Sequence, residues 1–534
     1  MMKPTTKTLL ALVMSATLIG CGGSDSNNSE LESKPSAETY ACDPSQVEVS
    51  NTLRTYQIMV ESFVSGDSNI GHGTGYGTSH HNGDLQGIID SLDYIKATGA
   101  NAIWLTPIFH SAPISGQDHW ADRLDATGYF TSDYFSVDPR FGDMATAKEL
   151  VETAHEKGLY VFFDGVFGHH KGNVVASPSG LKPEGSSNPV SYPGSLDFYK
   201  EVATYWIEEL KIDGWRLDQA YQVPTEAWTE IRKAVDEASQ SVTYTNSQGE
   251  NVHPLGYMVA EIWSDEDYIA ETGYGPTGNP ALCSAFDFPM RYRIVETLAA
   301  SENNTLGRDA SWLANGYDTH DKYPEHAKPN LMLGNHDLVR FGDLLQRGNI
   351  AQPSEDEYWL RHKAAFAFQA SYTGPITLYY GEEIGDEVPN FDVKEASDTC
   401  AEKGLCDDHV ARSSAKIEGM TGDVLTSNQS ELRDYVAELM AIRDANPALY
   451  KGSRLNIVAQ DTTYIDLKTY EDNKIVYAAN LGENTINVTL SSEQLGTNDD
   501  LVDLMSNQVV EIQSDNYQLT LQPFEARFLR VNPN

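Results

Sequence analysis

Basic residues are scarce in this sequence. Its 534 residues include 37 Lys and Arg against 78 Asp and Glu, so the formal net charge is −41 at pH 7. Nucleic acids and anionic membrane surfaces would repel such a chain, and neither is an expected partner. A neutral substrate would meet no repulsion. Because 40% of the residues are hydrophobic and 10% aromatic, the length predicts one large globular domain and a smaller one.

The apolar run at residues 9–19 is too short to span a membrane as a mature helix. Two lysines precede it and the sequence LIGC (18–21) ends it, which is typical of a bacterial export signal whose cysteine is lipidated. We therefore expect residues 1–20 to be a lipoprotein signal peptide and Cys21 to be the lipid anchor. An ordinary signal peptide with a coincidental cysteine is the alternative. The expected location is the outer membrane or cell surface, or the periplasmic face, with the lipid as the only membrane contact.

Cysteine is also rare, with five in the chain. The four that remain beside Cys21 allow three disulfide pairings in an oxidising compartment. We favour a local Cys400–Cys406 bridge across the loop AEKGL, which leaves Cys42 to pair with Cys283. The spacing is poor for a zinc site.

The order of apolar and polar segments predicts the fold. Residues 21–50 have the composition of a flexible tether. From residue 51 to 446, eight apolar segments alternate with helical patterns, which favours a closed (β/α)8 TIM barrel over an open sheet. The segments are TYQIMVESF, NAIWLTPIF, LYVFFDGVF, IDGWRLD, YMVAEIW, SAFDF, NLMLGNHD and PITLYYGEE. No Gly-x-Gly-x-x-Gly turn follows any of them, so a dinucleotide site is not expected.

Two further regions complete the predicted architecture. A Pro-, Gly- and Ser-rich insertion at about 169–195 follows the third strand, and we expect it to form a short lobe over the barrel mouth. From residue 447 to 534 the pattern changes to short alternating segments separated by turn residues. This predicts a C-terminal antiparallel β domain, a β-sandwich that packs against the barrel.

Chemically capable residues stand where these strands end, and in such barrels the active site lies at that end. They are Asp164 and His169 after the third strand, Arg216 and Asp218 at the fourth, Glu261 and Trp263 at the fifth, and Asn335, His336 and Asp337 at the seventh. Paired carboxyl groups of this kind cleave glycosidic bonds in retaining enzymes, one as an ionised nucleophile and the other as a proton donor. The sequence thus predicts a glycosidase site.

The surroundings of the two main acids suggest different roles. Arg216 and Asp218 are two apart on a strand and face the same side, and a guanidinium favours the ionised carboxylate that a nucleophile needs. A purely structural ion pair is the alternative for these two residues taken alone. Glu261 follows the apolar Met258-Val259-Ala260, and burial would raise its pKa and keep the proton that an acid catalyst donates.

These motifs make the chain resemble the α-amylase family of retaining α-glucan enzymes. DGVFGHH (164–170), GWRLD (214–218), AEIW (260–263) and GNHD (334–337) are similar to its four conserved regions in the family's order. GYFTSDYFSVDPRFG (128–142) and GPITLYYGEEIG (374–385) are further similarities. The resemblance implies Asp218 as nucleophile, Glu261 as general acid/base and Asp337 as the carboxylate that binds and distorts the sugar. It also implies that His169, Arg216 and His336 contact the same glucose, with Tyr129 stacked beneath it.

The sequence departs from the family at its usual calcium positions. It has Gly168 where many members have an asparagine, and Gln222 where they have a histidine. Neither is a strong ligand for a hard cation, so we expect the usual site to be degraded and no cofactor to be required. A different calcium site at Asp67, Asn69 and Asp84 is an alternative to ordinary turn roles for these residues.

The expected activity is hydrolysis of α-1,4-glucosidic bonds in starch-type glucans and maltooligosaccharides. GWRLDQAYQV and AEIW are most similar to the neopullulanase and cyclomaltodextrinase branch, although the chain has no room for the N-terminal β domain of those enzymes. Exo-acting α-glucosidase or 4-α-glucosyltransferase activity is the first alternative. A non-catalytic glycan-binding barrel is the alternative from another class, and the presence of all three carboxylates argues against it.

Overall fold

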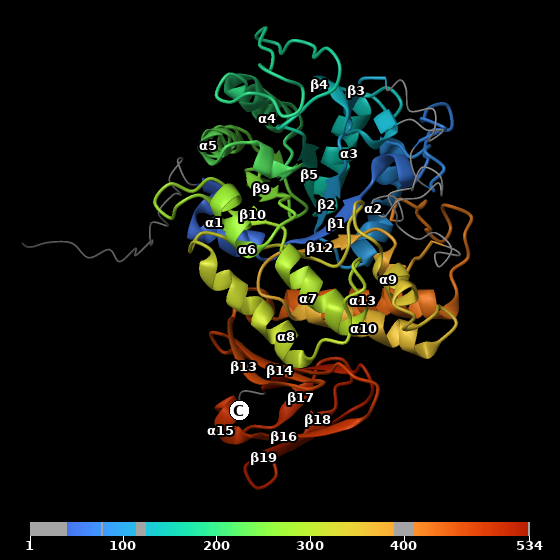
Figure 1. Cartoon of the computed structure of the whole chain (residues 1–534), viewed down its shortest axis with the longest axis vertical. Helices are drawn as coiled ribbons and strands as arrows, with labels where there is room; N and C mark the ends of the chain where they lie inside the picture. Colours follow the sequence, from blue (N-terminus) through green and yellow to red (C-terminus); the bar gives the residue numbers. More distant parts are fainter. Residues whose placement is uncertain (1–39, 76–77, 114–123, 389–410, 532–534) are drawn as a thin grey trace, which may run out of the picture. The chain divides into compact units, whose positions relative to one another are not determined.

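Eight short parallel strands form the centre of the protein (Figure 1). The computed structural model describes residues 40–75, 78–113, 124–388 and 411–531. The strands are β1 (Arg54–Ile58), β2 (Ala102–Leu105), β5 (Tyr160–Gly165), β6 (Gly214–Leu217), β9 (Tyr257–Ala260), β10 (Ser284–Ala285), β11 (Leu331–Met332) and β12 (Ile376–Tyr379). Their order is β10-β9-β6-β5-β2-β1-β12-β11, and a parallel bridge between Phe286 and Asn330 joins the two edges. The ring therefore closes, and the predicted (β/α)8 barrel is confirmed.

The barrel strands are buried along almost their whole length, as expected when helices cover one face and the other faces the barrel core. In β2, β6, β9 and β12 every residue is buried. At Gly214, the first residue of β6, φ is 146° and a Cβ would lie 1.8 Å from the carbonyl oxygen of Tyr257 on β9. Glycine is therefore required at the start of the strand that carries Arg216.

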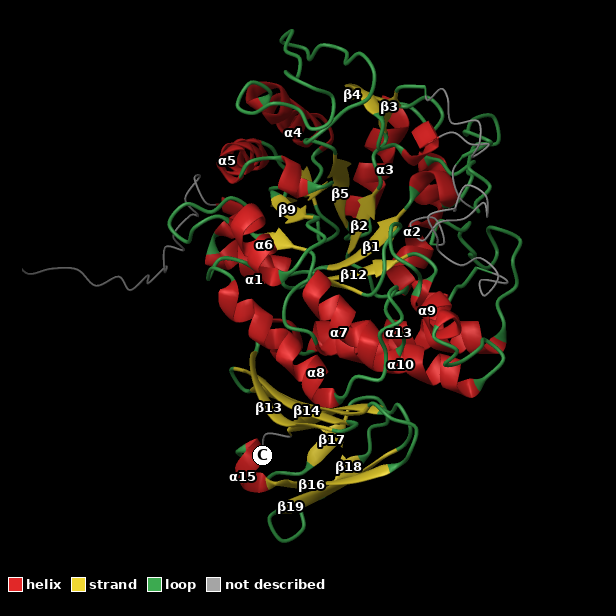
Figure 2. Cartoon of the chain, in the orientation of Figure 1, coloured by secondary structure: helices red, strands yellow, loops and turns green. Residues whose placement is uncertain are grey.

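Helices follow the strands and form the outer layer (Figure 2). The longer ones are α2 (Leu85–Ala97), α3 (Met144–Glu156), α4 (Leu196–Leu210), α5 (Thr225–Ser241), α7 (Phe288–Leu298), α9 (Phe341–Arg347), α10 (Asp356–Ser371) and α13 (Ser427–Ala445). Aspartates cap several N-termini: the side chain of Asp84 accepts from Gly87 N–H in α2, and that of Asp143 from Thr146 N–H in α3. Such caps satisfy N–H groups that have no partner within the helix.

Shorter elements connect this framework. They are η2 (Val60–Ser62), η4 (Leu124–Thr127), η5 (Ala220–Gln222), the hairpins β3 (Phe109–Ser111) with β4 (Thr131–Val137) and β7 (Tyr244–Thr245) with β8 (Asn251–Val252), α6 (Glu266–Ile269), η6 (Ala270–Tyr274), α8 (Ala310–Ala314), η7 (Asn315–Lys322) and η8 (Glu382–Ile384). Residues 166–195, between β5 and α4, contain no helix or strand beyond one bridge between Gly185 and Val190. This is the segment expected to form the inserted lobe.

The N-terminal segment requires a correction. Residues 21–50 were expected to be a flexible tether, yet from Tyr40 onward they are folded as η1 (Tyr40–Cys42) and α1 (Pro44–Ser50). A disulfide joins Cys42 to Cys283, the pairing expected from the sequence, and Ala41 N–H donates to Asp236 Oδ1 at 3.1 Å. These long-range bonds hold a segment whose own composition is too polar to suggest burial. Cys21, the Cys400–Cys406 pair and the expected signal peptide lie outside the described residues.

A second, antiparallel domain follows the barrel, as predicted. Its six-stranded sheet has the order β13-β14-β15-β20-β17-β18, and β16 pairs with β19. The elements are α14 (Pro447–Lys451), β13 (Ser453–Gln460), β14 (Thr463–Tyr470), β15 (Asn473–Asn480), β16 (Ile486–Ser491), α15 (Ser492–Leu495), β17 (Leu501–Asp503), β18 (Val509–Val510), β19 (Asn516–Leu521) and β20 (Ala526–Val531). Alternating buried residues of β19 and β20 contribute to a separate core. Within the described ranges, no helix has the length and apolar character needed to cross a membrane.

Candidate active site

A single buried arginine holds three carboxyl groups together at the C-terminal end of the barrel. Arg216 Nη1 lies 2.8 Å from Asp218 Oδ1 and 2.9 Å from Asp164 Oδ1, and Nη2 lies 2.9 Å from Glu261 Oε2. Arg216 and Asp164 are fully buried, whereas Asp218 and Glu261 each keep 6% of their surface exposed. The parallel register of β5, β6 and β9 brings these residues from distant parts of the chain to one place.

Two of the three acids around Arg216 have raised pKa values, chiefly because they are buried. Burial raises the pKa of Glu261 to about 8, and the nearby Asp218 and Asp337 add to the effect while Arg216 opposes it. Burial likewise raises the pKa of Asp164 to about 7. The backbone N–H of Gln219 donates to Glu261 Oε2 at 3.0 Å, which fixes the direction of this side chain. Gln219 has φ 41°, and this left-handed conformation follows directly after Asp218.

Asp337, the third carboxylate expected to take part in catalysis, lies on the other side of the cavity and has a separate cationic partner, Arg412. Asp337 Oδ1 is 2.6 Å from Arg412 Nη2, and Asp337 Oδ2 is 3.0 Å from His336 Nε2. Burial disfavours the charge on Asp337, but His336, Arg412 and Arg216 outweigh it and lower the pKa. Asp337 therefore remains ionised under conditions in which Glu261 holds a proton.

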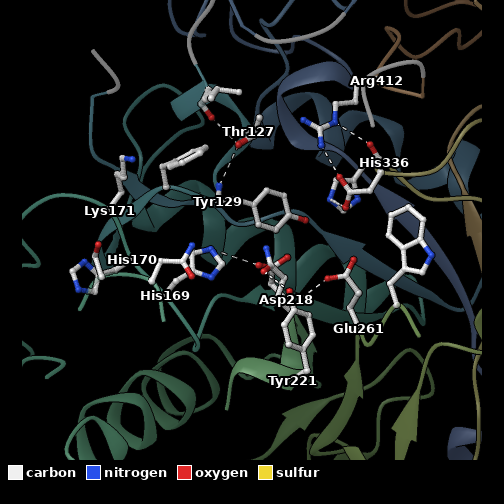
Figure 3. A pocket seen from close by; sticks show the side chains of 17 residues that line it. Thr127, Tyr129, His169, His170, Lys171, Asp218, Tyr221, Glu261, His336 and Arg412 are labelled. Carbon is white, nitrogen blue, oxygen red and sulfur yellow. Dashed lines mark hydrogen bonds and ion pairs between the residues drawn. The ribbon is translucent and has the colours of Figure 1, made fainter. Parts of the chain in front are cut away.

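These groups line a cavity of about 600 Å³ (Figure 3). Asp218 and Glu261 point into the same space, with Tyr129 and His336 beside it. The Tyr129 hydroxyl donates to Asp164 Oδ2 at 2.8 Å, and its ring stacks on that of His336 with centroids 5.2 Å apart. Volume and lining are typical of a small-molecule or oligosaccharide site, in which apolar rings surround a few directed polar groups.

The remaining residues expected from the sequence take three different places. His169 lines the cavity, with Nε2 3.7 Å from Asp218 Oδ2. Trp263 lies at the rim, 49% exposed, and donates its indole N–H to the Tyr292 hydroxyl at 2.9 Å. Asn335 is buried behind the wall, where its side-chain oxygen accepts from Asp337 N–H at 2.8 Å. Asn335 thus orients Asp337 without reaching the cavity.

The residues at the family's calcium positions do not fit a calcium ion. Gly168 offers no side-chain oxygen, and a Cβ there would lie 2.5 Å from Gln222 Oε1. That oxygen already faces His169 Nδ1 at 3.0 Å. A hard cation requires several oxygen ligands, and this place offers one amide that is already hydrogen-bonded.

Asp67, Asn69 and Asp84, the residues of the alternative calcium site, lie next to one another and are hydrogen-bonded within the loop. Asp84 is buried and accepts backbone N–H groups at both oxygens, from Gly66, Asp67 and Gly87. Asp67 Oδ1 accepts from both the backbone and the side chain of Asn69. In the part of the chain that the structure describes, no group of three or more His, Cys, Asp or Glu side chains is arranged to hold a metal ion.

Sequence reasoning missed Arg412, Gln219 and Tyr221, which also line the cavity. Gln219 and Tyr221 follow Asp218 closely, and their position after a strand end was a usable signal. Arg412 lies beyond the last barrel strand, outside any strand or helix, so strand-end reasoning had no means to find it.

Comparisons with known proteins agree with this geometry. Residues 57–177 and 196–423 match the family "Alpha amylase, catalytic domain". Two cyclomaltodextrinases are similar: that of Geobacillus thermopakistaniensis is 29% identical over 82% of this chain, and that of Thermoanaerobacter pseudethanolicus is 31% identical over 58%. The chain covers 68% and 51% of their lengths. Crystal structures of AmyP with maltose and of an AmyP variant with maltotriose are 65% identical over 92% of this chain and 98% or 99% of theirs, with TM-scores of 0.90.

The match to the catalytic domain covers more than half of the chain and includes all three carboxylates. The close structural relatives share both the barrel and the length of the chain. The chain therefore belongs to the alpha-amylase family of glycoside hydrolases.

Proposed function

We propose that the protein hydrolyses α-1,4-glucosidic bonds of starch-type glucans and maltooligosaccharides with retention of configuration. The observation that carries this proposal is the shared guanidinium of Arg216, which holds Asp218 and Glu261 on one wall of the cavity. The AmyP structures with bound maltose and maltotriose, and the relatives named cyclomaltodextrinase, support an α-glucan as substrate.

In the first step, Asp218 Oδ2 attacks the anomeric carbon while Glu261 gives its proton to the glycosidic oxygen, so the C–O bond to the leaving sugar breaks. Arg216 contacts Asp218 Oδ1, which leaves the other oxygen directed at the cavity. Burial, which raises the pKa of Glu261, keeps the proton in place at neutral pH. The product of this step is a glucosyl ester on Asp218.

In the second step, Glu261 takes a proton from water, which attacks the same carbon and releases Asp218. Two inversions give net retention. Asp337, ionised through His336 and Arg412, would bind the hydroxyls of the same sugar and favour its distorted conformation. Tyr129, His169 and His336 would provide the remaining contacts to this sugar, and Trp263 a contact at the rim.

Digestion of maltoheptaose tests the proposal, with early products resolved by size and anomeric form. New α-anomers and mid-chain fragments are expected. Glucose alone would indicate an exo-acting α-glucosidase, products longer than the substrate would indicate a 4-α-glucosyltransferase, and β-anomers would contradict retention. Binding of maltoheptaose without cleavage would support the alternative of a non-catalytic glycan-binding barrel. Asp218→Asn should abolish cleavage; unchanged cleavage would refute the nucleophile assignment.

We also propose that the mature chain is tethered by a lipid on Cys21 and needs no calcium at the usual family position. The LIGC sequence supports the first statement, and the poor fit of Gly168 and Gln222 supports the second. Palmitate labelling of the wild type and of Cys21→Ser checks the anchor. Activity after dialysis against a calcium chelator checks the metal: retained activity is expected, and a loss restored by calcium would overturn the proposal.

A further inference from the structure

The side-chain amide of Gln222 contacts three other side chains behind the cavity. Its Nε2 lies 2.9 Å from Gln219 Oε1 and 3.1 Å from Asn188 Oδ1, and its Oε1 lies 3.0 Å from His169 Nδ1. Gln219 follows the proposed nucleophile, whereas His169 and Asn188 lie near opposite ends of the segment 166–195 between β5 and α4. One amide therefore connects the segment after β6 to two distant points of the inserted lobe, beside the proposed glucosyl site.

The chemistry of the amide decides which way it faces. The NH₂ group of Gln222 donates to the two oxygens of Gln219 and Asn188, so its carbonyl oxygen faces His169. Gln219 Oε1 also accepts from the Tyr221 hydroxyl at 2.9 Å, which is consistent with an oxygen at that place. A carbonyl oxygen can only accept. His169 Nδ1 must therefore carry a hydrogen and donate it.

This assignment leaves the other nitrogen of His169 without a hydrogen in the neutral imidazole. His169 Nε2 lies 3.7 Å from Asp218 Oδ2, too far for a hydrogen bond. If Nε2 carried the hydrogen, a small rotation of the ring would let it donate to Asp218 and occupy the lone pair that attacks the sugar. The tautomer with hydrogen on Nδ1 keeps Asp218 Oδ2 available.

We infer that Gln222 is a positioning residue that holds His169 with its hydrogen on Nδ1, so that Nε2 faces the cavity as an acceptor for a sugar hydroxyl and does not compete for Asp218. The catalytic consequence rests on the proposed function, whereas the tautomer itself does not. Gly168 makes the arrangement possible, because a Cβ there would lie 2.6 Å from the Cβ of Gln222. Gly168 and Gln222, the two departures from the family pattern, thus act together. They place a hydrogen-bonding amide where many other members of the family hold a calcium ion.

Two variants separate hydrogen bonding from packing. Gln222→Met fills the same space beside Gly168 but cannot accept from His169 Nδ1. Gln222→Glu keeps an acceptor there, and the side-chain amides of Gln219 and Asn188 can turn their NH₂ groups toward it. Gln240→Met on α5 is the matched control. The Gln240 side chain donates a hydrogen bond to the Asp236 carbonyl oxygen at 3.1 Å, and this contact lies away from the cavity.

Kinetics with maltoheptaose give the first readout. Gln222→Met should lower kcat about tenfold to a hundredfold, the range expected when a buried polar group loses its partner. Gln222→Glu should retain most of the rate, and Gln240→Met all of it. Equal rates for Gln222→Met and the wild type would refute the role of the hydrogen bond. Equal losses of rate in the Met and Glu variants would mean that Gln222 acts only through packing.

Nitrogen NMR of histidine-labelled protein gives a second readout that does not depend on activity. The His169 signals, identified by their loss in His169→Gln and recorded where the imidazole is neutral, should show hydrogen on Nδ1 in the wild type and in Gln222→Glu. In Gln222→Met the hydrogen should shift to Nε2. Hydrogen on Nε2 in the wild type would overturn the inference even if the enzyme is active, whereas an inactive wild type with hydrogen on Nδ1 would overturn only the proposed function.

Discussion

Two buried clusters of charge lie in this molecule, and they are built in opposite proportions. The rim cluster consists of Arg216 with Asp164, Asp218 and Glu261, one cation for three acids. The interface cluster lies between the barrel and the C-terminal domain and consists of Asp466 with Arg454 and Lys468, one acid for two cations. Asp466 Oδ2 accepts from Arg454 Nε at 2.7 Å and from the Tyr464 hydroxyl at 2.6 Å.

In each cluster, one member of the more numerous charge type has a pKa shifted in the direction that favours its neutral form. These members are Glu261 at the rim and Lys468 at the interface. At the rim, burial raises the pKa of Glu261 to about 8. At the interface, burial lowers the pKa of Lys468 to about 7. Lys468 is fully buried, and its Nζ donates to Thr373 Oγ1 of the barrel at 2.7 Å. Arg454 lies over the ring of Tyr317, also in the barrel, at 4.1 Å.

The difference between the clusters is access. Asp218 and Glu261 open on a cavity of about 600 Å³, whereas Asp466 and Lys468 are fully buried. A shifted pKa serves catalysis only where a substrate can reach the group, so we expect the rim cluster to control rate and the interface cluster to control stability. Variants that change both properties together would break this comparison.

The largest effect is expected for Glu261→Gln, which removes the proton donor of the rim cluster. We expect kcat on maltoheptaose to fall about 10²- to 10⁴-fold, the usual contribution of general acid–base catalysis. The wild type should lose activity as the pH rises through the pKa of Glu261, about 8, because the acid must hold its proton. The variant should lack this basic limb. Profiles of kcat against pH measure both effects.

The control for this prediction is Glu383→Gln. Glu383 is also a buried acid with a pKa raised by burial, but it accepts hydrogen bonds from Tyr56 and Tyr94 instead of lining the cavity. Its substitution should leave the basic limb in place. A wild-type rate that stays flat well above pH 8 would remove Glu261 from the role of acid.

A smaller effect is expected for Arg412→Ala. Asp337 would lose a cation at 2.6 Å, and its pKa would rise toward the ordinary value. Activity requires ionised Asp337, so the fall of kcat/KM at acidic pH should begin at a higher pH in the variant. Loss of the charged hydrogen bond that positions Asp337 should also lower kcat/KM about tenfold at neutral pH. Arg433→Ala on α13, where Arg433 lies 3.1 Å from Asp434, is the control. An unmoved acid limb would mean that Arg412 only packs against the wall.

The rim could largely be predicted from the sequence, because barrel strands end at one rim and residues two apart face the same side. That reasoning brought Asp164, Arg216, Asp218 and Glu261 together, and the structure places them around one guanidinium. Arg412 could not be found in this way, since it lies on a connecting segment that no periodicity describes.

Local composition also failed where long-range bonds decide the fold. Residues 40–50 are polar enough to be assigned to a tether, but the disulfide to Cys283 and the hydrogen bond to Asp236 fold them against the barrel. In the C-terminal domain, β16 and β19 alternate in burial as expected, whereas β14 and β15 are buried along most of their length. The sequence missed β13 and the short strands β17 and β18. The residues of β13 are exposed or half-buried, so no apolar face marks it as a strand.

At the interface, Asp466→Asn should change stability and not rate. Buried Lys468 and half-buried Arg454 would remain without a carboxylate, and breaking a buried pair costs about 3 kcal/mol of unfolding free energy. Urea unfolding measures the loss, and kcat on maltoheptaose should stay at the wild-type value. Asp472→Asn in the exposed turn between β14 and β15 is the matched control. A fall in kcat would show that the interface cluster reaches the active site.

The smallest effect is expected for Lys468→Met, and it depends on pH. The folded state lowers the pKa of Lys468 to about 7, whereas the unfolded chain has the ordinary value near 10.5, so protonation favours unfolding. The wild type should lose this part of its stability as the pH falls from about 10 toward 7. Methionine carries no charge, so the unfolding free energy of the variant relative to the wild type should rise by about 2–3 kcal/mol between pH 9 and pH 6.

Urea unfolding of both proteins at several pH values measures this change, with Lys474→Met on β15 as the control for losing a half-buried lysine. Parallel curves for the wild type and Lys468→Met would show that Lys468 is charged in the folded state throughout. In that case the surplus cation of the interface would be stabilised by Asp466 after all, and the two clusters would differ only in their access to substrate.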